Sequence, residues 1–305
     1  MPILFYGTVV KAASRDDVLK LLRSFLDQRE KSLVRILVRF WDEQKKAITY
    51  KEIREAILNG SLDIDKLTVW QEDYAVFVAK ILAPEWAKAM NAGMKQLKER
   101  FPGWEYDVTS DRIARFVSER SGLFVTNCAQ NQLEALNELL KMAVDTGMPA
   151  DQLSRAIRPL IGLTKRQAAT NFQYYCDLRA GGTGHKAALD KCIRLAGKQH
   201  RYRAMNIART ELAWAYNKGE YAGVKQAQAE KLLGDLKKVW CTAEDERVCS
   251  ICGELDGQEA PMEGSFQFPG DSLWAGFKET PPAHNGCRCV LLYIEIKSPF
   301  GAERR

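Results

Sequence analysis

The residues 240–258, WCTAEDERVCSICGELDGQ, and 281–294, PPAHNGCRCVLLYI, decide how the last part of this chain folds. They carry a CxxC pair and, after a long intervening loop, an HxxCxC cluster. Two short ligand pairs separated by a loop are typical of a tetrahedral zinc site, because residues three apart can both turn inward around a tight turn. The spacing therefore predicts a structural Zn²⁺ site with five candidate ligands: Cys249, Cys252, His284, Cys287 and Cys289.

The choice of four ligands from these five is a question of geometry. The CxxC cysteines form one pair, and His284 with Cys287 repeats their spacing. If residues 288–294 form a strand, Cys287 and Cys289 point to the same face, because side chains alternate along a strand. We expect Cys287 to complete the site, with Cys289 as the alternative to Cys287.

Other uses of these cysteines compete with a structural zinc site. Two disulfides would need suitably placed Cα and Cβ atoms, and a chain without a secretion signal more often uses CxxC for metal or redox chemistry. Reduced thiols without a metal are a second alternative. A thioredoxin-like site would place the CxxC at the start of a helix after a strand, whereas Gly253 and the Asp256-Gly257 turn follow it here. A catalytic zinc would keep one position for water, and five protein ligands favour a closed site.

Length and composition describe a globular protein of more than one part. The 305 residues suggest two domains, or one large domain with a satellite, and a 46% hydrophobic share is enough to bury a core. No apolar run approaches the roughly 20 residues that a membrane helix needs, so we expect no membrane anchor. Residues 1–10 lack the basic start and cleavage site of a signal peptide. The net charge of +6 permits contact with nucleic acid without requiring it.

Most of the chain before residue 237 has the periodicity of amphipathic helices. Apolar residues recur at steps of three and four along residues 15–41, and Thr49 with Glu52 has the spacing of a capping box. Pro84 is expected to break or kink a helical pattern between residues 65 and 97. The stretch 198–230 reads as one long helix, or as two helices joined near Gly219.

These patterns predict a mainly α fold, in which an elongated multi-helix body is followed by a small α+β, zinc-stapled carboxyl-terminal module. The break at Phe101-Pro102-Gly103 suggests the first boundary. The expected division has four parts: a helical docking region at 1–105, a helical body at 106–236, the zinc-binding module at 237–297 and a tail at 298–305. The module is short enough to need a metal for an independent core.

A basic cluster lies at the start of the stretch 198–230. Lys198, Arg201 and Arg203, with Tyr202 among them, could meet phosphate oxygens of a nucleic acid. The alternative is the ordinary solvated face of a helix.

The sequence IARTELAWAYNKGEYAGVKQA at 207–227, followed by the two cysteine-bearing stretches, resembles the Mu protein F-like family of tailed-phage minor head, or head-morphogenesis, proteins. Residues 162–182 resemble the helical part of the same family, so the likeness covers residues 111–294. Arg209, Thr210 and Glu211 match the helix signature, and the five candidate ligands match the cysteine and histidine pattern. One departure is Asn285-Gly286, where the family more often has a proline beside the histidine.

The resemblance implies a virion protein, assembled in the host cytoplasm and present in few copies in the capsid interior near the portal vertex. It implies the portal protein as a partner, with the major capsid or scaffolding protein and packaged DNA as further partners. The implied role is head morphogenesis, with a part in DNA packaging or ejection. We expect no enzyme, since no catalytic constellation stands out. The rival hypothesis is a zinc-stapled DNA-binding protein or a nuclease, in which Asp245, Glu246 or Asp256 would help to hold a second, catalytic metal.

Overall fold

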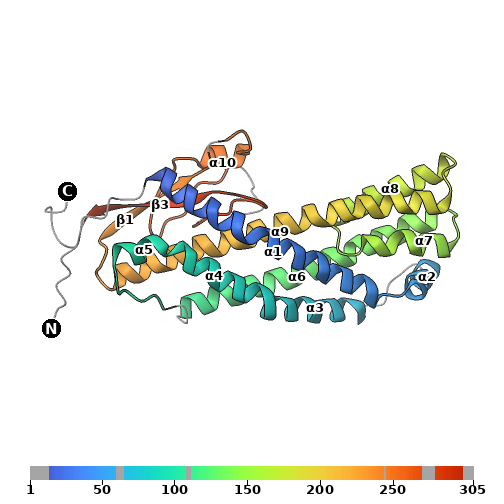
Figure 1. Cartoon of the computed structure of the whole chain (residues 1–305), viewed down its shortest axis with the longest axis horizontal. Helices are drawn as coiled ribbons and strands as arrows, with labels where there is room; N and C mark the ends of the chain where they lie inside the picture. Colours follow the sequence, from blue (N-terminus) through green and yellow to red (C-terminus); the bar gives the residue numbers. More distant parts are fainter. Residues whose placement is uncertain (1–13, 60–64, 108–110, 244, 270–278, 298–305) are drawn as a thin grey trace. The chain divides into compact units, whose positions relative to one another are not determined.

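The computed structural model describes residues 14–59, 65–107, 111–243, 245–269 and 279–297, and it is mainly helical (Figure 1). The helical elements in chain order are α1 (Arg15–Ala47), α2 (Tyr50–Asn59), α3 (Asp65–Phe77), the π-helical η1 (Val78–Leu82), α4 (Ala83–Gly93), α5 (Lys95–Arg100), α6 (Asp111–Asp145), α7 (Ala150–Ile157), the 3₁₀-helical η2 (Arg158–Leu160), α8 (Lys165–Ala180), α9 (His185–Ala229) and α10 (Ser250–Leu255). The strands are β1 (Asp235–Cys241), β2 (Glu259–Pro261) and β3 (Val290–Lys297). None of the described helices is long and apolar enough to span a lipid bilayer.

The three strands form one antiparallel sheet in the order β2-β1-β3. Lys238 of β1 lies opposite Ala260 of β2 and Tyr293 of β3, which fixes the register. The predicted combination of a helical majority with a small α+β carboxyl-terminal part is confirmed.

The chain divides into two compact units, each assembled from segments that are far apart in sequence. The first, here called the sheet unit, comprises Met1–Glu30, Pro84–Val117 and Arg209–Arg305. The second, the helical unit, comprises Lys31–Ala83 and Ser118–Ala208. Three of the four boundaries fall inside α1, α6 and α9, so each of these helices contributes to both units, and the fourth follows Ala83, the first residue of α4. The expected four-part division remains a prediction about separately folding segments.

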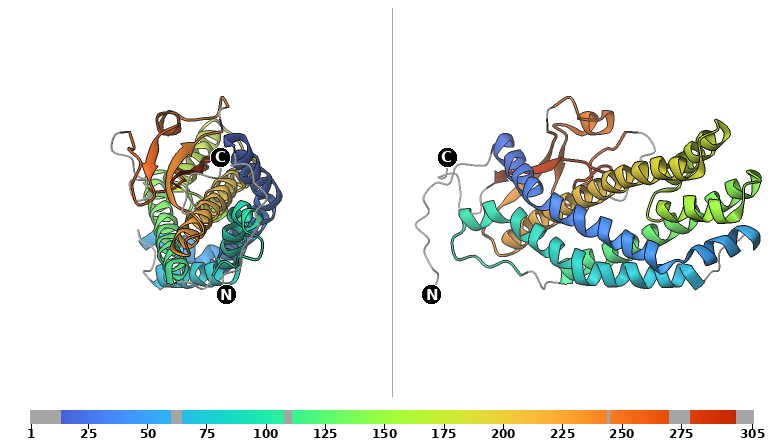
Figure 2. Two further views of the ribbon diagram at one scale, coloured as in Figure 1. Left: turned by 90° about the vertical axis from the view of Figure 1, so that its left-hand side faces the viewer. Right: turned by 45° about the vertical axis from the view of Figure 1, so that its right-hand side comes forward.

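In the sheet unit, the carboxyl-terminal part of α9 runs beside the sheet in every view (Figure 2). Trp214 of α9 packs edge-on against Trp86 of α4, with ring centroids 5.6 Å apart. A Cβ atom at Gly219 would lie 2.3 Å from the Cα of Met90, so only glycine allows α4 to approach α9 this closely. Gly219 therefore marks a close contact between two backbones, and α9 continues through it as one helix.

In the helical unit, large aromatic side chains fill the core. Trp41, Trp70 and Tyr74 are buried, and the indole Nε1 of Trp41 donates a 3.0 Å hydrogen bond to the Tyr74 hydroxyl. That hydroxyl donates in turn to Gln132 Oε1 at 3.2 Å. Because the indole N–H of Trp41 and the hydroxyl of Tyr74 both have partners, burying these two rings leaves neither polar group unpaired.

Local sequence signals mark the starts of two of the described helices, α2 and α8. Thr49 and Glu52 form the predicted capping box, and Thr164 with Gln167 forms a second one at the start of α8. The interruption expected at Pro84 takes the form of the π-helical turn η1, after which α4 begins without a break. Residues 111–145 form the single long helix α6.

Candidate metal centre

The CxxC pair lies at the start of the short helix α10. Cys249 is the N-cap residue of α10, and its sulfur accepts a 3.4 Å hydrogen bond from the backbone N–H of Cys252. The expectation that this pair would not begin a helix is therefore wrong, because Gly253 and the Asp256-Gly257 turn still leave room for six helical residues. A CxxC pair at the start of a helix can bind a metal or act in redox chemistry. The side chains around the pair must therefore distinguish the two.

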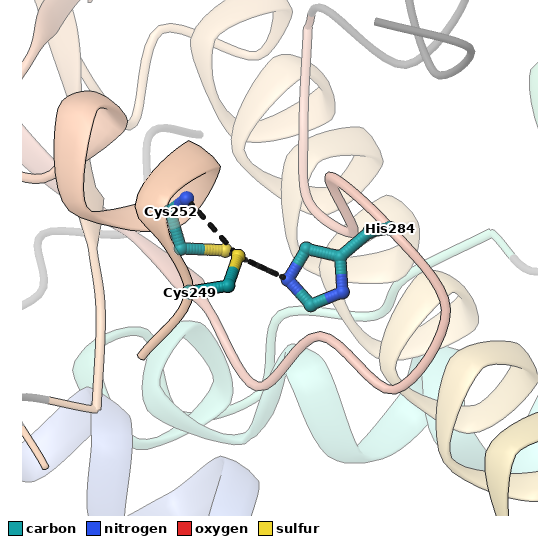
Figure 3. Close-up of side chains that lie close together, drawn as sticks. All are labelled: Cys249, Cys252 and His284. Carbon is teal, nitrogen blue, oxygen red and sulfur yellow. Dashed lines mark hydrogen bonds between the residues drawn. The ribbon is translucent and has the colours of Figure 1, made fainter. Parts of the chain in front are cut away.

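The histidine approaches the pair from the loop before β3. His284 Nε2 lies 3.1 Å from the sulfur of Cys249 and 3.1 Å from that of Cys252 (Figure 3). Its other ring nitrogen, Nδ1, lies 2.9 Å from the carbonyl oxygen of Asn285. If Nδ1 carries the proton and donates it there, the lone pair of Nε2 faces the two sulfurs, which is the tautomer that a metal ligand needs.

The remaining two cysteines, Cys287 and Cys289, also lie close to Cys252. Its sulfur is 3.8 Å from that of Cys287, which matches the separation of about 3.8 Å between two sulfurs on a tetrahedral zinc with bonds of about 2.3 Å. Two groups of potential ligands result, Cys249 with Cys252 and His284, and Cys252 with Cys287 and Cys289. In each group the ligand atoms lie within 4.8 Å of one another, and Cys252 belongs to both.

All five predicted ligands thus gather in one place, and their chemistry fits zinc. Thiolate sulfur and imidazole nitrogen are the donors that Zn²⁺ prefers in closed structural sites. Cys252, Cys287 and Cys289 are buried, and Cys249 and His284 are half-buried, so few positions around a bound ion would face water. The choice between Cys287 and Cys289 as the fourth ligand stays a prediction.

The neighbouring thiols have pKa values that are shifted in opposite directions. Hydrogen bonds with the thiols of Cys287 and Cys289 raise the pKa of Cys252. Burial opposes ionisation of Cys287, but hydrogen bonds from the other two thiols and the nearby His284 outweigh it and hold the pKa of Cys287 well below its ordinary value. A thiolate at this position is the form in which cysteine binds a metal.

Helix α9 supports the ligand-bearing segment through two hydrogen bonds. The backbone N–H of Gly286, between His284 and Cys287, donates a 2.8 Å hydrogen bond to the Thr210 hydroxyl. Asn217 Nδ2, two turns further along α9, donates to the carbonyl oxygen of Cys289 at 3.3 Å. Thr210 belongs to the predicted signature, whereas Asn217 was not predicted to support the site. Asn217 follows the apolar stretch 212–216 and directly precedes Lys218, so the sequence alone gives no signal of this role.

Two arginine pairs fix the loop and the helix that flank the cluster. Arg288, between the last two cysteines, makes two hydrogen bonds of 2.6 and 2.7 Å to Asp245, and these hold the pKa of that carboxyl group well below its usual range. Arg209 makes two hydrogen bonds of 2.7 and 2.8 Å to Glu30 of α1. The second signature residue with a charge, Glu211, is buried on α9.

Two of the three carboxylates proposed for a catalytic metal, Asp245 and Asp256, have structural partners. Asp245 is paired with Arg288, and Asp256 accepts a hydrogen bond from the backbone N–H of Thr242 at 2.9 Å and pairs with Arg15. Among the residues that the structure describes, the groups of three or more potential metal ligands are the two that share Cys252. Nothing in this arrangement favours a second metal site.

The basic residues predicted to meet nucleic acid lie elsewhere, on the part of α9 that belongs to the helical unit. Lys198 and Arg201 are exposed. Arg203 is buried, donates a 2.6 Å hydrogen bond to the carbonyl oxygen of Gly162 and lies over the ring of Trp41. Its guanidinium group is therefore committed to the core, and including it in a nucleic-acid surface was wrong.

Comparison with known proteins places the chain in a family. No match was found among curated proteins or among solved structures. The family described as Phage Mu protein F like protein matches residues 134–292, which is a little over half of the chain. This segment contains both the α9 signature and all five cysteine and histidine residues of the cluster. The chain therefore belongs to the Phage Mu protein F like family.

Proposed function

We propose that this chain is a minor head protein of a tailed phage, located in the capsid interior at or near the portal vertex. Family membership supports a role in phage head morphogenesis. The observation that carries the proposal is the hydrogen bond from Gly286 to Thr210, because it joins the two parts of the family pattern, the signature helix and the cysteine cluster, into one structure. The portal protein is the proposed principal partner, with packaged DNA and the major capsid or scaffolding protein as further partners.

The Cys/His cluster is proposed to hold one structural Zn²⁺ and to act without turnover. Cys249, Cys252 and His284 would supply three ligands, and Cys287 or Cys289 the fourth. Bound zinc would cross-link α10 to the segment before β3 and so stabilise the fold around it. The role in DNA packaging or ejection is proposed on the family resemblance alone.

Co-expression with the portal protein of the same phage tests the proposal. The full chain should elute with the portal oligomer, and elemental analysis of the purified protein should give about one zinc per chain, as expected of a single four-ligand site. Cys252→Ser should lose the zinc, whereas Cys176→Ser, at a half-buried position in the helical unit, should keep it. A chain that never binds the portal would contradict the assignment of partner, and cleavage of duplex DNA by zinc-loaded protein would favour the nuclease instead.

A further inference from the structure

The positive charge of the chain is concentrated on one short part of α9. Residues 185–205 contain six lysines and arginines and one acidic residue, Asp190. Their net charge of +5 nearly equals the +6 of the whole chain, in which 45 basic residues otherwise almost balance 39 acidic ones. Residues 185–205 therefore carry most of the formal net charge of the chain, which makes them a candidate for contact with a polyanion.

Four of these cations form a stripe along the exposed face of the helix, here called the α9 stripe. They are spaced three, four and three residues apart, which keeps them on one side of an α-helix, and all four are exposed: Lys191, Arg194, Lys198 and Arg201. The opposite face is buried at Cys192, Ala196, His200 and Ala204. The helix therefore presents these four charges to solvent, whereas the opposite face packs small side chains and His200 into the core.

Within the part of the chain that the structure describes, the side chains of the α9 stripe are unpaired. None of its four side chains has a hydrogen bond, ion pair or ring contact with another described residue. Elsewhere many basic residues are paired, as Arg54 is with Asp151 and Lys165 with Glu138. Because neutralising partners are absent from the described structure, the charges of the stripe remain available to an external polyanion.

We propose that the α9 stripe binds the phosphate backbone of duplex DNA without sequence specificity. Ten residues of helix span about 15 Å, and one strand of B-DNA carries a phosphate every roughly 3.4 Å of its axis, so the stripe is as long as about four successive phosphates. Tyr202, which is 65% exposed, adds a hydroxyl that can donate to a phosphate oxygen. The cations dominate this face, whereas a stable protein interface usually has an apolar centre. The proposal is independent of portal binding and of the metal.

The test is fluorescence anisotropy of the full-length protein with labelled duplex DNA of random sequence, at a series of salt concentrations. The stripe variant replaces Lys191, Arg194, Lys198 and Arg201 by Gln, which keeps the helix propensity. The control variant replaces four exposed basic residues on α1 and α6 that also lack a described partner, by the same residue: Lys20, Arg39, Arg115 and Lys141. Both variants lower the formal net charge from +6 to +2, so they differ only in where the charge is lost.

If all four cations meet phosphates, log K should fall against log salt with a slope of about −3.6, an affinity loss of about a hundredfold between 50 and 200 mM salt. The stripe variant should lose this slope and most of the binding, the control should keep both, and Arg194→Lys with Arg201→Lys should bind like the parent. Equal losses in the stripe and control variants would overturn the proposal in favour of net charge alone. Unchanged DNA binding with lost portal binding in the stripe variant would overturn it in favour of an acidic protein partner.

Discussion

The two units of this protein use the same residue type in opposite ways. In the helical unit, Cys128, Cys176 and Cys192 belong to neither group of potential metal ligands among the described residues, and burial raises the pKa of Cys192 to about 11. In the sheet unit, five cysteine and histidine side chains meet around Cys252. The composition of a cysteine-rich chain therefore does not decide between core packing and metal binding. The spacing of the cysteines indicates which use applies, because the CxxC pair and the HxxCxC cluster of the sheet unit have the spacing of metal ligands.

The largest expected difference between the units is in their dependence on a metal. Exhaustive chelation, or Cys252→Ser, should unfold the surroundings of the cluster, because structural zinc supplies on the order of 10 kcal/mol of apparent binding free energy. Hydrogen exchange should show lost protection in β1, β3 and α10 and unchanged protection in α7 and α8. If the amides of the sheet unit were as well protected after chelation as before it, the two units would not differ in their dependence on a metal.

A second apolar cluster limits how far that unfolding should spread. Leu236 and Met262 pack with Tyr221 and Val224 of α9 and with Leu97 of α5. This part of the sheet unit is therefore supported by ordinary hydrophobic burial. We expect the amides next to it to stay protected longer than those of Cys287 and Cys289 when the metal is removed.

The glycine substitutions come next in expected size. Gly219→Ala would place a Cβ atom within 2.5 Å of Met90 backbone atoms, so the two helices would have to separate, at a cost of about 3 kcal/mol. Gly122→Ala in α6 is the matched control, since nothing lies within 4 Å of its Cβ position, and it should stabilise by up to about 1 kcal/mol. Chemical denaturation measures both. Equal and small effects would show that the α4 to α9 contact is looser in solution.

Acid should act on the helical unit through His200. Burial, with Lys45 and Arg203 nearby, lowers the pKa of this imidazole from 6.5 to about 4. The unfolded chain therefore binds the proton first, so stability is lost as the pH falls below 6.5, by about 2 kcal/mol between pH 7 and 5. Denaturation of the parent and of His200→Gln at both pH values checks this, and the variant should lack this component.

The geometry around His200 offers a way for this prediction to fail. Nδ1 lies 2.7 Å from the Ala196 carbonyl oxygen, and Nε2 lies 2.8 Å from that of Ile161. Only the doubly protonated ring can donate to both. If these two hydrogen bonds outweigh burial, acid would stabilise the helical unit relative to His200→Gln.

The smallest effect should come from Thr210. Thr210→Val keeps the shape of the side chain but removes the acceptor for the Gly286 N–H, which should cost about 1 to 2 kcal/mol and weaken metal binding about tenfold. Thr210→Ser should restore both. Thr170→Val, at an exposed position of α8, is the control. Competition with a coloured chelator measures the affinity, and an unchanged value for Thr210→Val would show that the hydrogen bond does not position the ligands.

Much of this structure could be predicted from local patterns. The helical majority, the capping boxes and the gathering of the five ligands follow from periodicity and spacing. The burial of Arg203 could not be predicted, because it depends on Trp41 and Gly162, which are distant in sequence. For the same reason the support of Cys289 by Asn217, 72 residues earlier, could not be predicted. The helical periodicity identifies which residues share one face of a helix, but it does not identify the distant residues that pack against that face.

The close contact at Gly219 has a practical consequence for anyone who trims this protein. The segment that matches the family, residues 134–292, does not include α1, α4 and α5, which precede it in the chain. A fragment cut to those limits would leave Gly219 without Met90, Trp214 without Trp86 and Arg209 without Glu30. The segment that matches the family is thus shorter than the segments that pack together in the sheet unit. A fragment intended for expression should therefore include α1, α4 and α5.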